Sequence, residues 1–546
     1  MASCAGAADA VHFRWFKYQG HDTRFAQPLP KGHYRNPILA GFHPDPSVVR
    51  VGDRFYLVNS TFAWFPGIPV YESRDLVHWR QIGHAIQRAS QIDYAGLGVS
   101  RGIFAPDISF HDGKFYVVTT AMDAGGLFLV TADNPAGPWS QPTWFGKIKN
   151  VIDPSLFFDD NGKAYIVYNG PPKGRPAYKG ERAIWMQAFD VAHDRLVGPR
   201  KMVLDGGVPV PGYPHPVWVE GPHLYKHHGW YYLMCAEGGT SLQHSEVVLR
   251  SRSPWGPFKA YAHNPILTQR NLPADRPHPV INAGHADLVS GPDGSWWAVF
   301  LASRAYGKTH FNTGRETFLL PVHWHAGWPT ILAPGKVVPM QAPAPAFMHS
   351  QASQAPLTGN IVWRDDFNAP TIGPGWMTLR APASRWYDLT SRPGSLTIHP
   401  LPYRLDGGHS PSLLARRQQN LRFSASTALT IPVHAGVVAG MVAFQNENHW
   451  YFLGVRNVHG RAEVFLQKRD GKTTTTVAKA LIDASGPLEL KMRGELGDYS
   501  FAYRPHGAAW HRLGRDEDGT ILSTDVAGGF VGTMIGLYAR TGEKHP

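Results

Sequence analysis

Three carboxylates stand at matching places in a repeated sequence pattern. Asp45 and Asp153 each begin an Asp-Pro-Ser triplet, and Glu220 begins the run "EGPHLY". An isolated Asp-Pro usually marks a turn. Carboxylates that are brought together repel one another, and burial raises the cost of their charge, so a fold rarely keeps such a cluster without a ligand, a metal or a reaction. The three residue types are those of acid–base chemistry on a bound substrate.

The pattern that carries these residues occurs five times. Each copy has a polar start, a short apolar run, a turn with Gly and an aromatic-rich run, and the copies begin at Asp45, Ala105, Asp153, Glu220 and His285. Their first matching aromatic residues are roughly 50 to 65 residues apart, which is the spacing of β-propeller blades with long loops. Each copy is therefore predicted to be a β-hairpin within one blade, and an irregular β-sandwich is the weaker alternative.

A five-bladed propeller would bring the starts of its innermost strands together near the central axis. Asp45, Asp153, Glu220 and His285 would then line one pocket, although about 240 residues separate the first from the last. A metal site is the alternative interpretation of this cluster, but the four residues lack the close local spacing of typical metal ligands.

The chain as a whole is predicted to be all-β, because 57 Gly and 46 Pro among 546 residues favour turns over long helices. Residues 1–32 are expected to be an N-terminal extension and residues 33–335 the propeller. Residues 336–360 are rich in Pro, Ala, Gln and Ser and are expected to be a linker. Residues 361–546 show period-two runs separated by turn signals, which predicts a second domain, a β-sandwich of the jelly-roll, concanavalin-like type.

Charge and hydropathy exclude several classes of partner. The net charge is +12, but no run of Lys and Arg exceeds two residues, so nucleic-acid binding is not expected. No stretch of 18 apolar residues predicts a membrane-spanning helix. Two cysteines do not form a disulfide framework. Cys4 follows small residues, as in a trimmed lipoprotein signal, which favours a periplasmic or secreted protein, with the cytoplasm as the alternative.

Two carboxyl groups that face a cleft are the typical catalytic groups of glycoside hydrolysis. One protonates the leaving oxygen, and the other activates water or attacks the sugar. Aromatic side chains that could stack on sugar faces stand nearby in the sequence: Phe62 and Trp64 in "STFAWFPGIP", Phe104 in "GIFAPD" and Trp218 in "WVEGPHLY".

The sequence from Tyr34 to Trp324 resembles glycoside hydrolase family 43, specifically its β-xylosidase and α-L-arabinofuranosidase members. The resemblance rests on "FHPDPSVVRVGDRFYLVNSTFAWFPGIP", "GIFAPDISFHDGKFY", "IDPSLFFDDNGKAYIVYNG", "CAEGGT", "SRSPWGPF" and "GRETFLLPVHW". It implies a five-bladed propeller, in agreement with the repeat. The C-terminal block is similar, more loosely, to the concanavalin-like domain that follows the propeller in several such enzymes, most clearly at "GGFVGTMIGLYA".

The resemblance also implies roles for individual residues. Asp45 matches the general base that activates water, Glu220 the general acid, and Asp153 the carboxylate that orients the acid and raises its pKa. Arg315 in "GRETF" matches an Arg that reaches the substrate. His285 in "GHADLV" matches an axial His beside a cation or water cluster. No cofactor is therefore expected to be required, with a calcium ion near His285 as the exception to test.

The implied activity is exo-acting, inverting release of xylose from the non-reducing end of β-1,4-xylo-oligosaccharides. An α-L-arabinofuranosidase that acts on arabinoxylan or arabinan is the main alternative, because Phe104 stands where many β-xylosidases of the family carry Trp. A carbohydrate-binding propeller without turnover and a scaffold for protein partners are further alternatives. The expected partner is an oligosaccharide, and a homo-oligomer is allowed.

Overall fold

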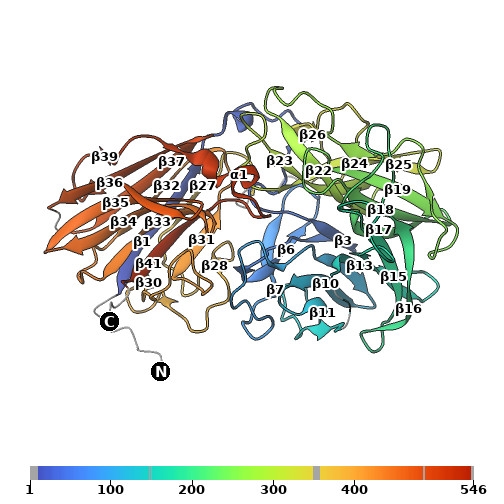
Figure 1. Cartoon of the computed structure of the whole chain (residues 1–546), viewed down its shortest axis with the longest axis horizontal. Coiled ribbons are helices and arrows are strands. Elements are labelled where there is room, and N and C mark those ends of the chain that lie inside the picture. The colour runs from blue at the N-terminus through green and yellow to red at the C-terminus, as the bar shows by residue number, and fades with distance from the viewer. Residues whose placement is uncertain (1–9, 147, 149, 349–356, 484–485, 543–546) are drawn as a thin grey trace.

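The computed structural model describes residues 10–146, 148, 150–348, 357–483 and 486–542. Cys4 lies outside these residues. Strands dominate the described part, with a single α-helix, α1 (Thr524–Ala527), and two 3-10 turns, η2 (Thr23–Phe25) and η3 (Gly519–Leu522). Two β domains lie side by side (Figure 1), which confirms the all-β prediction. No helix in the described residues is long and apolar enough to cross a membrane.

Five antiparallel sheets form the larger domain and confirm the predicted five-bladed propeller. The first contains β3 (Ser47–Val51), β4 (Arg54–Val58), β6 (Gly67–Ser73) and β7 (Arg80–Ile86). The second contains β8 (Gly102–Ile103), β9 (Asp107–His111), β10 (Lys114–Met122), β11 (Gly126–Ala132) and β12 (Thr143–Trp144). The third contains β13 (Ile152–Phe158), β14 (Ala164–Gly170), β15 (Ala183–Asp190) and β16 (Arg195–Asp205). The fourth contains β17 (Glu220–His227), β18 (Trp230–Glu237), β19 (Ser245–Ser251), β20 (Lys259–Ala260) and β21 (Leu267–Thr268). The fifth contains β22 (Val280–Ser290), β23 (Trp296–Arg304), β24 (Glu316–His325) and β25 (Trp328–Thr330).

Buried polar groups join the innermost strands of all five blades at the axis. Ser47 of β3 donates its hydroxyl to the carboxylate of Asp287 in β22, with Asp107 of β9 also within 3.2 Å. Asp107 accepts the backbone N–H of Leu156 in β13, and Asp287 accepts the hydroxyl of Tyr225 in β17. Because buried hydrogen bonds of this kind require particular partners, the network fixes the strand ends that carry the predicted site residues.

The smaller domain is a sandwich of two sheets. One sheet contains nine strands: β29 (Tyr387–Asp388), β30 (Leu396–Ile398), β1 (Val11–Gly20), β32 (Arg422–Leu429), β37 (Leu488–Glu495), β38 (Asp498–Pro505) and β39 (His511–Arg512), with β27 (Val362–Asp365) paired to β1 and β40 (Glu517–Asp518) to β38. The other contains eight: β36 (Thr473–Ile482), β35 (Arg461–Asp470), β34 (His449–Val458), β33 (Val437–Asn446), β41 (Met534–Thr541), β31 (Leu413–Arg417), β28 (Met377–Leu379) and β5 (Trp64–Phe65). Their facing side chains share one apolar core.

The expected organisation at the N-terminus needs correction. Residues 1–32 were expected to precede the propeller as an extension, but β1 lies inside the sandwich and pairs with β27, β30 and β32. In Figure 1 this blue strand lies among the orange and red strands of the C-terminal domain. Its residues alternate between the core and the surface, as expected of a sheet with one buried face. A partner more than 400 residues away leaves no signal in the local sequence.

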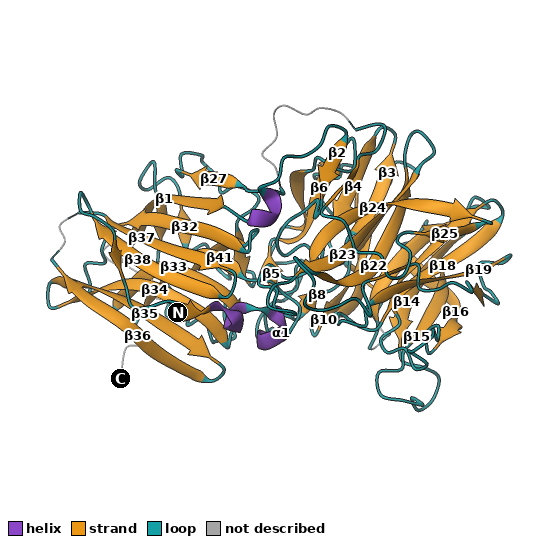
Figure 2. Ribbon diagram, turned by 90° about the horizontal axis from the view of Figure 1, so that it is seen from above, coloured by secondary structure: helices purple, strands orange, loops and turns teal. Residues whose placement is uncertain are grey.

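The two domains also exchange structure at their boundary. The two-residue strand β5 belongs to a propeller segment but pairs with β28 of the sandwich. Inside the expected linker, β26 (Gln341–Pro343) pairs with β2 (His33–Arg35). One apolar core contains buried side chains of both domains, among them Phe42 and Trp64 from the propeller segment and Leu379 and Phe444 from the sandwich. The domains therefore form a continuous packed unit, which Figure 2 shows from a second direction.

Candidate active site

The predicted site residues stand where the innermost strands begin or are distorted. Asp45 lies two residues before the start of β3, Glu220 is the first residue of β17, and Asp153 and His285 lie within β13 and β22. Asp45, Asp153 and His285 have φ values of 51°, 52° and 54°, in the left-handed region that non-glycine residues rarely adopt. The strand pairing shifts beside Asp153, Glu220 and His285. Such irregularities redirect side chains and are concentrated at functional sites.

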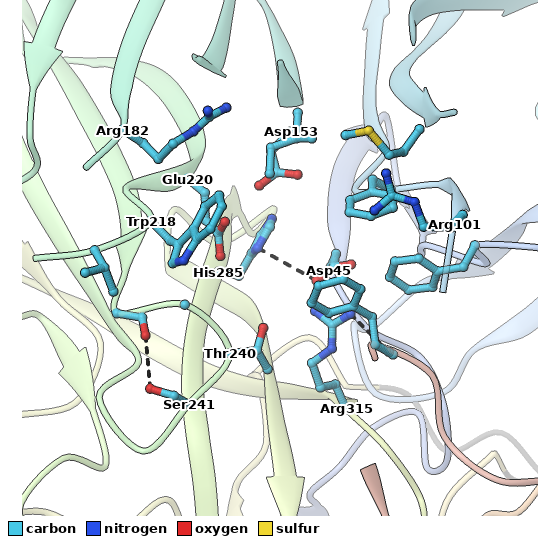
Figure 3. A pocket seen from close by; sticks show the side chains of 18 of the residues that line it. Asp45, Arg101, Asp153, Arg182, Trp218, Glu220, Thr240, Ser241, His285 and Arg315 are labelled. Carbon is cyan, nitrogen blue, oxygen red and sulfur yellow. Dashed lines mark hydrogen bonds and ion pairs between the residues drawn. The ribbon is translucent and has the colours of Figure 1, made fainter. Parts of the chain in front are cut away.

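These side chains line one cavity of about 700 Å³. Asp45, Asp153, Glu220 and His285 point into it from four different blades (Figure 3). Arg315, from the turn just before β24 of the fifth blade, also lines the cavity. The repeat in the sequence thus becomes a cluster of acid–base groups in space.

Asp45 is held in place by polar neighbours. Arg315 Nη1 lies 2.5 Å from Asp45 Oδ1, and the Ser60 hydroxyl donates to Asp45 Oδ2 at 2.6 Å. His285 Nδ1 lies 3.8 Å from Asp45 Oδ1. Burial lowers the pKa of His285 to about 4, so the imidazole is neutral at neutral pH. A buried carboxylate paired with a guanidinium is suited to accept a proton from water.

Glu220 and Asp153 have the opposite environment. Burial, followed by repulsion from Asp153 and Asp45, raises the pKa of Glu220 well above its ordinary value. Burial and repulsion from Asp45 likewise raise the pKa of Asp153 to about 7, although the Gly221 N–H donates to its carboxylate at 3.1 Å. A proton is therefore retained in the Glu220–Asp153 pair near neutral pH. A carboxyl group that keeps its proton can act as a general acid.

Aromatic side chains form part of the wall. Phe62, Phe104 and Trp218 line the cavity, and Trp218 is 44% exposed. Trp64, which was expected to bind substrate, does not line it. Its indole is fully buried and packs edge-on against Phe444 of the sandwich. The alternation of β5 turns this ring into the interdomain core, so the expectation for Trp64 is corrected.

One wall residue comes from the sandwich. Phe530 stacks on Phe62 with ring centroids 5.7 Å apart and meets Phe104 edge-on. Its carbonyl accepts Arg315 Nη2 at 3.2 Å, and its N–H donates to the Ser100 hydroxyl at 2.9 Å. The second domain therefore completes the pocket. The motif "GGFVGTM" contains Phe530, but nothing in its sequence marks it as a pocket residue.

Sequence reasoning also missed polar wall residues. Arg101, Arg182, Thr240 and Ser241 line the cavity from loops. Thr240 ends the motif "CAEGGT", but the motif did not mark it as a pocket residue. The Arg182 guanidinium lies over the Trp218 ring at 5.6 Å, and its charge acts on Glu220 and Asp153. These residues add donors for hydroxyl groups around the carboxylates.

The raised pKa of Glu220 makes a prediction for stability. Between the ordinary pKa of Glu and the raised native value, the native state binds more protons than the unfolded state, so the unfolding free energy of the wild-type protein falls as pH rises. Each unit of difference is worth about 1.4 kcal/mol. Since Gln does not titrate, Glu220→Gln is expected to raise Tm relative to wild type, and by more at pH 8 than at pH 5. Calorimetry at both pH values checks this, and a difference in Tm that narrows as pH rises would contradict the raised pKa of Glu220.

Comparisons with known proteins agree with this geometry. Residues 34–329 match the family model of glycosyl hydrolases family 43, and residues 364–545 match that of the beta xylosidase C-terminal concanavalin A-like domain. The chain is 39% identical over 520 residues to a xylosidase/arabinosidase of Butyrivibrio fibrisolvens, covering 93% of this chain and 96% of that protein. It is 38% identical over 525 residues to a non-reducing end alpha-L-arabinofuranosidase of Bacteroides ovatus, covering 94% of this chain and 92% of that protein. A crystal structure of a GH43_12 protein from capybara gut metagenome superposes with a TM-score of 0.90 at 36% identity, covering 98% and 100% of the two chains. A xylan beta-1,4-xylosidase from Bacillus halodurans superposes with a TM-score of 0.84 at 34% identity, covering 94% and 97%.

Proposed function

Because this chain belongs to glycosyl hydrolases family 43, a family of glycoside hydrolases, we propose that it releases xylose from the non-reducing ends of β-1,4-xylo-oligosaccharides with inversion of configuration. The observation that supports this most is the cavity in which Asp45 is paired with Arg315 while the pKa of Glu220 is raised well above its ordinary value. The Phe530 wall from the sandwich favours a pocket that takes a chain end over an open groove that takes the middle of a polymer.

The reaction follows from the two protonation states. Asp45 takes a proton from a water molecule, whose oxygen forms a bond to the anomeric carbon. The bond between that carbon and the glycosidic oxygen breaks as Glu220 gives its proton to the leaving oxygen. Asp153 positions the Gly221 backbone beside Glu220 and disfavours a second negative charge there. Arg315 donates to Asp45 and fixes the direction of its carboxylate.

Hydrolysis of an aryl β-D-xyloside against an aryl α-L-arabinofuranoside tests the substrate. We expect a higher kcat/KM for the xyloside. The relatives described above carry both names, and Phe104 departs from the Trp of many β-xylosidases, so arabinofuranoside preference is the specific alternative. Binding of xylo-oligosaccharides with no turnover of either compound would instead identify a carbohydrate-binding propeller.

Inversion is tested by the anomer first released. Attack by water on the face opposite the leaving group converts a β-xyloside into α-xylose before mutarotation. Proton NMR recorded within the first minutes of hydrolysis is expected to show the α anomer ahead of the β anomer. Initial release of β-xylose would remove Asp45 as a general base acting through water and would make it a nucleophile.

Calcium near His285 has no part in this proposal. Calcium takes six to eight oxygen ligands, whereas His285 offers a nitrogen and its neighbouring carboxylate, Asp45, is already bound to Arg315. Among the described residues, the His and Asp side chains close enough to share an ion are Asp107, His223 and Asp287. Their carboxylates already accept hydrogen bonds from the axial network, so no catalytic step is assigned to a metal there.

The wider setting is also a proposal. We expect an exported, periplasmic or secreted protein on the basis of the N-terminal sequence, and cell fractionation tests this expectation. The partner is a carbohydrate substrate, as the family implies. A homo-oligomer is tested by light scattering.

A further inference from the structure

A second cavity, of about 450 Å³, lies between the propeller and the sandwich. Tyr71 and Trp79 line it from the propeller, and Trp363, Arg416 and Arg417 line it from β27 and β31 of the sandwich. We call it the interdomain cavity. None of these five residues lines the catalytic pocket. Its volume is in the range of small-molecule sites, about 300 to 1,000 Å³.

Arg417 brings an unpaired charge to this cavity. Its side chain is 7% exposed, and its Nε donates to the Phe42 carbonyl at 2.5 Å. Its Nη2 is buried and has no hydrogen-bond partner among the residues that the structure describes. No carboxylate of the described residues acts on the charge of Arg417. A buried guanidinium that lacks both a counter-ion and a full set of acceptors is costly for the fold.

Arg416 adds a second guanidinium. Its planar group lies over the Trp363 ring, 3.6 Å from the ring centre. Burial lowers the pKa of Arg416 to about 9, although the attraction of Asp365 opposes this shift, and repulsion from Arg417 adds a smaller lowering. The Asp365 carboxylate already accepts the Trp376 indole N–H and the Phe367 backbone N–H, both at 2.9 Å. Stacking on Trp363 fixes the plane of the guanidinium and leaves its N–H edge for another acceptor.

The other arginines of the cavity differ from these two. Arg80 and Arg364 line it as well, but both are exposed and already paired, Arg80 with Glu72 at 3.2 Å and Arg364 with Asp366 at 2.6 Å. Among the described residues, Arg416 and Arg417 are therefore the arginines of this cavity without an ion pair, although the Asp365 carboxylate attracts Arg416. Arg364 provides a matched control in the same wall.

We propose that the interdomain cavity binds a small oxyanion, a carboxylate or a phosphate, at the guanidiniums of Arg416 and Arg417. Arginine forks match the planar oxygens of such groups and form charge-assisted hydrogen bonds to them. Gly375 leaves the space that the Arg416 guanidinium occupies, because a Cβ at position 375 would lie 2.9 Å from that group. The Trp rings beside the arginines would suit a carboxylate carried on a sugar, that is, a uronic acid, and inorganic phosphate is the second source of the same chemistry.

Calorimetric titration of the full-length protein tests the site. The buffer contains neither phosphate nor carboxylate, and the ligands are glucuronate, inorganic phosphate and glucose as the uncharged control. We expect at least one of the two anions to bind at one saturable site. We expect glucose not to bind at this site. Tighter binding of glucuronate than of phosphate assigns the site to a uronic acid, and the reverse order assigns it to a phosphate. Absence of saturable binding of either anion up to 20 mM would overturn the proposal.

Two variants locate the bound anion. Arg416→Gln is expected to weaken binding at least tenfold, whereas Arg364→Gln changes it less than twofold. Both are expected to hydrolyse the aryl glycoside at the wild-type rate, since neither residue lines the catalytic pocket. If Arg416→Gln does not fold, Gly375→Ala gives the same test, because its methyl group encroaches on the guanidinium while both arginines remain. Unchanged anion affinity in the folded Arg416→Gln or Gly375→Ala variant would contradict the proposal.

Discussion

Glu220→Gln is expected to lose about 10²- to 10⁴-fold in kcat on xylo-oligosaccharides and far less on dinitrophenyl xyloside. A sugar alkoxide is a poor leaving group and needs the proton that Glu220 carries, whereas dinitrophenolate leaves nearly unaided. Burial and the neighbouring carboxylates keep that proton on Glu220, because they raise its pKa well above the ordinary value. Steady-state rates on both substrates check this expectation.

Asp45→Asn is the contrasting variant. Water must be activated whichever group leaves, so this variant is expected to slow both substrates alike. Arg315 would then lose its 2.5 Å carboxylate partner, which adds to the defect. If Glu220→Gln slowed the natural and activated substrates by the same factor, Glu220 would not be the general acid, and Asp153 would be the next residue to examine.

The pH profile gives an independent measure of the same proton. Glu220 acts in its protonated form, so the wild-type rate falls as pH rises through its raised pKa. Gln cannot lose a proton, and the basic limb is expected to disappear in Glu220→Gln. A basic limb that persists unchanged would assign it to another group.

The propeller and its carboxylates could be predicted because the pattern that carries them is repeated in the sequence. Five copies of one hairpin pattern predict five blades. Residues eleven positions before the first matching aromatic residue of each copy, or twelve in the case of Asp153, are expected to converge at the axis, whatever the loops between them do. Asp45, Asp153, Glu220 and His285 obey this rule, and the structure brings all four to one cavity. The positive φ values at three of them depend on neighbouring strands and leave no mark in the local pattern.

The features that the sequence did not predict depend on contacts between distant segments. Strand β1 finds its partner strand β32 about 400 residues away, and Phe530 reaches the pocket only because the sandwich packs against the propeller. Trp64 stands in an aromatic motif typical of sugar binding, yet its strand pairs with β28 and buries the ring. An aromatic residue type indicates that the side chain will either be buried or bind a sugar. Only the packing of the two domains decides between these outcomes.

Truncation after Gly335 is expected to give insoluble or weakly active protein. It leaves β1 without β27, β30 and β32, and it leaves β5 without β28. It also uncovers Phe42, Trp64 and the other propeller side chains of the shared core. Each large apolar side chain returned to water costs about 1.5 to 3 kcal/mol, and a whole domain is stable by only about 5 to 15 kcal/mol. Expression, solubility and activity of the truncated protein measure the loss.

Two further variants separate the loss of solubility from the loss of the pocket wall. Removing residues 1–32 as well eliminates the unpaired β1 but leaves the apolar face uncovered, so it is expected to remain insoluble. Phe530→Ala in the full-length chain keeps the interface and the carbonyl that accepts Arg315, and removes only the aromatic wall of the pocket. It is expected to be soluble with reduced kcat/KM, because the Phe530 ring packs on Phe62 and Phe104. A soluble, fully active protein ending at Gly335 would show that the propeller folds and works alone, and the sandwich would then have no part in the active site.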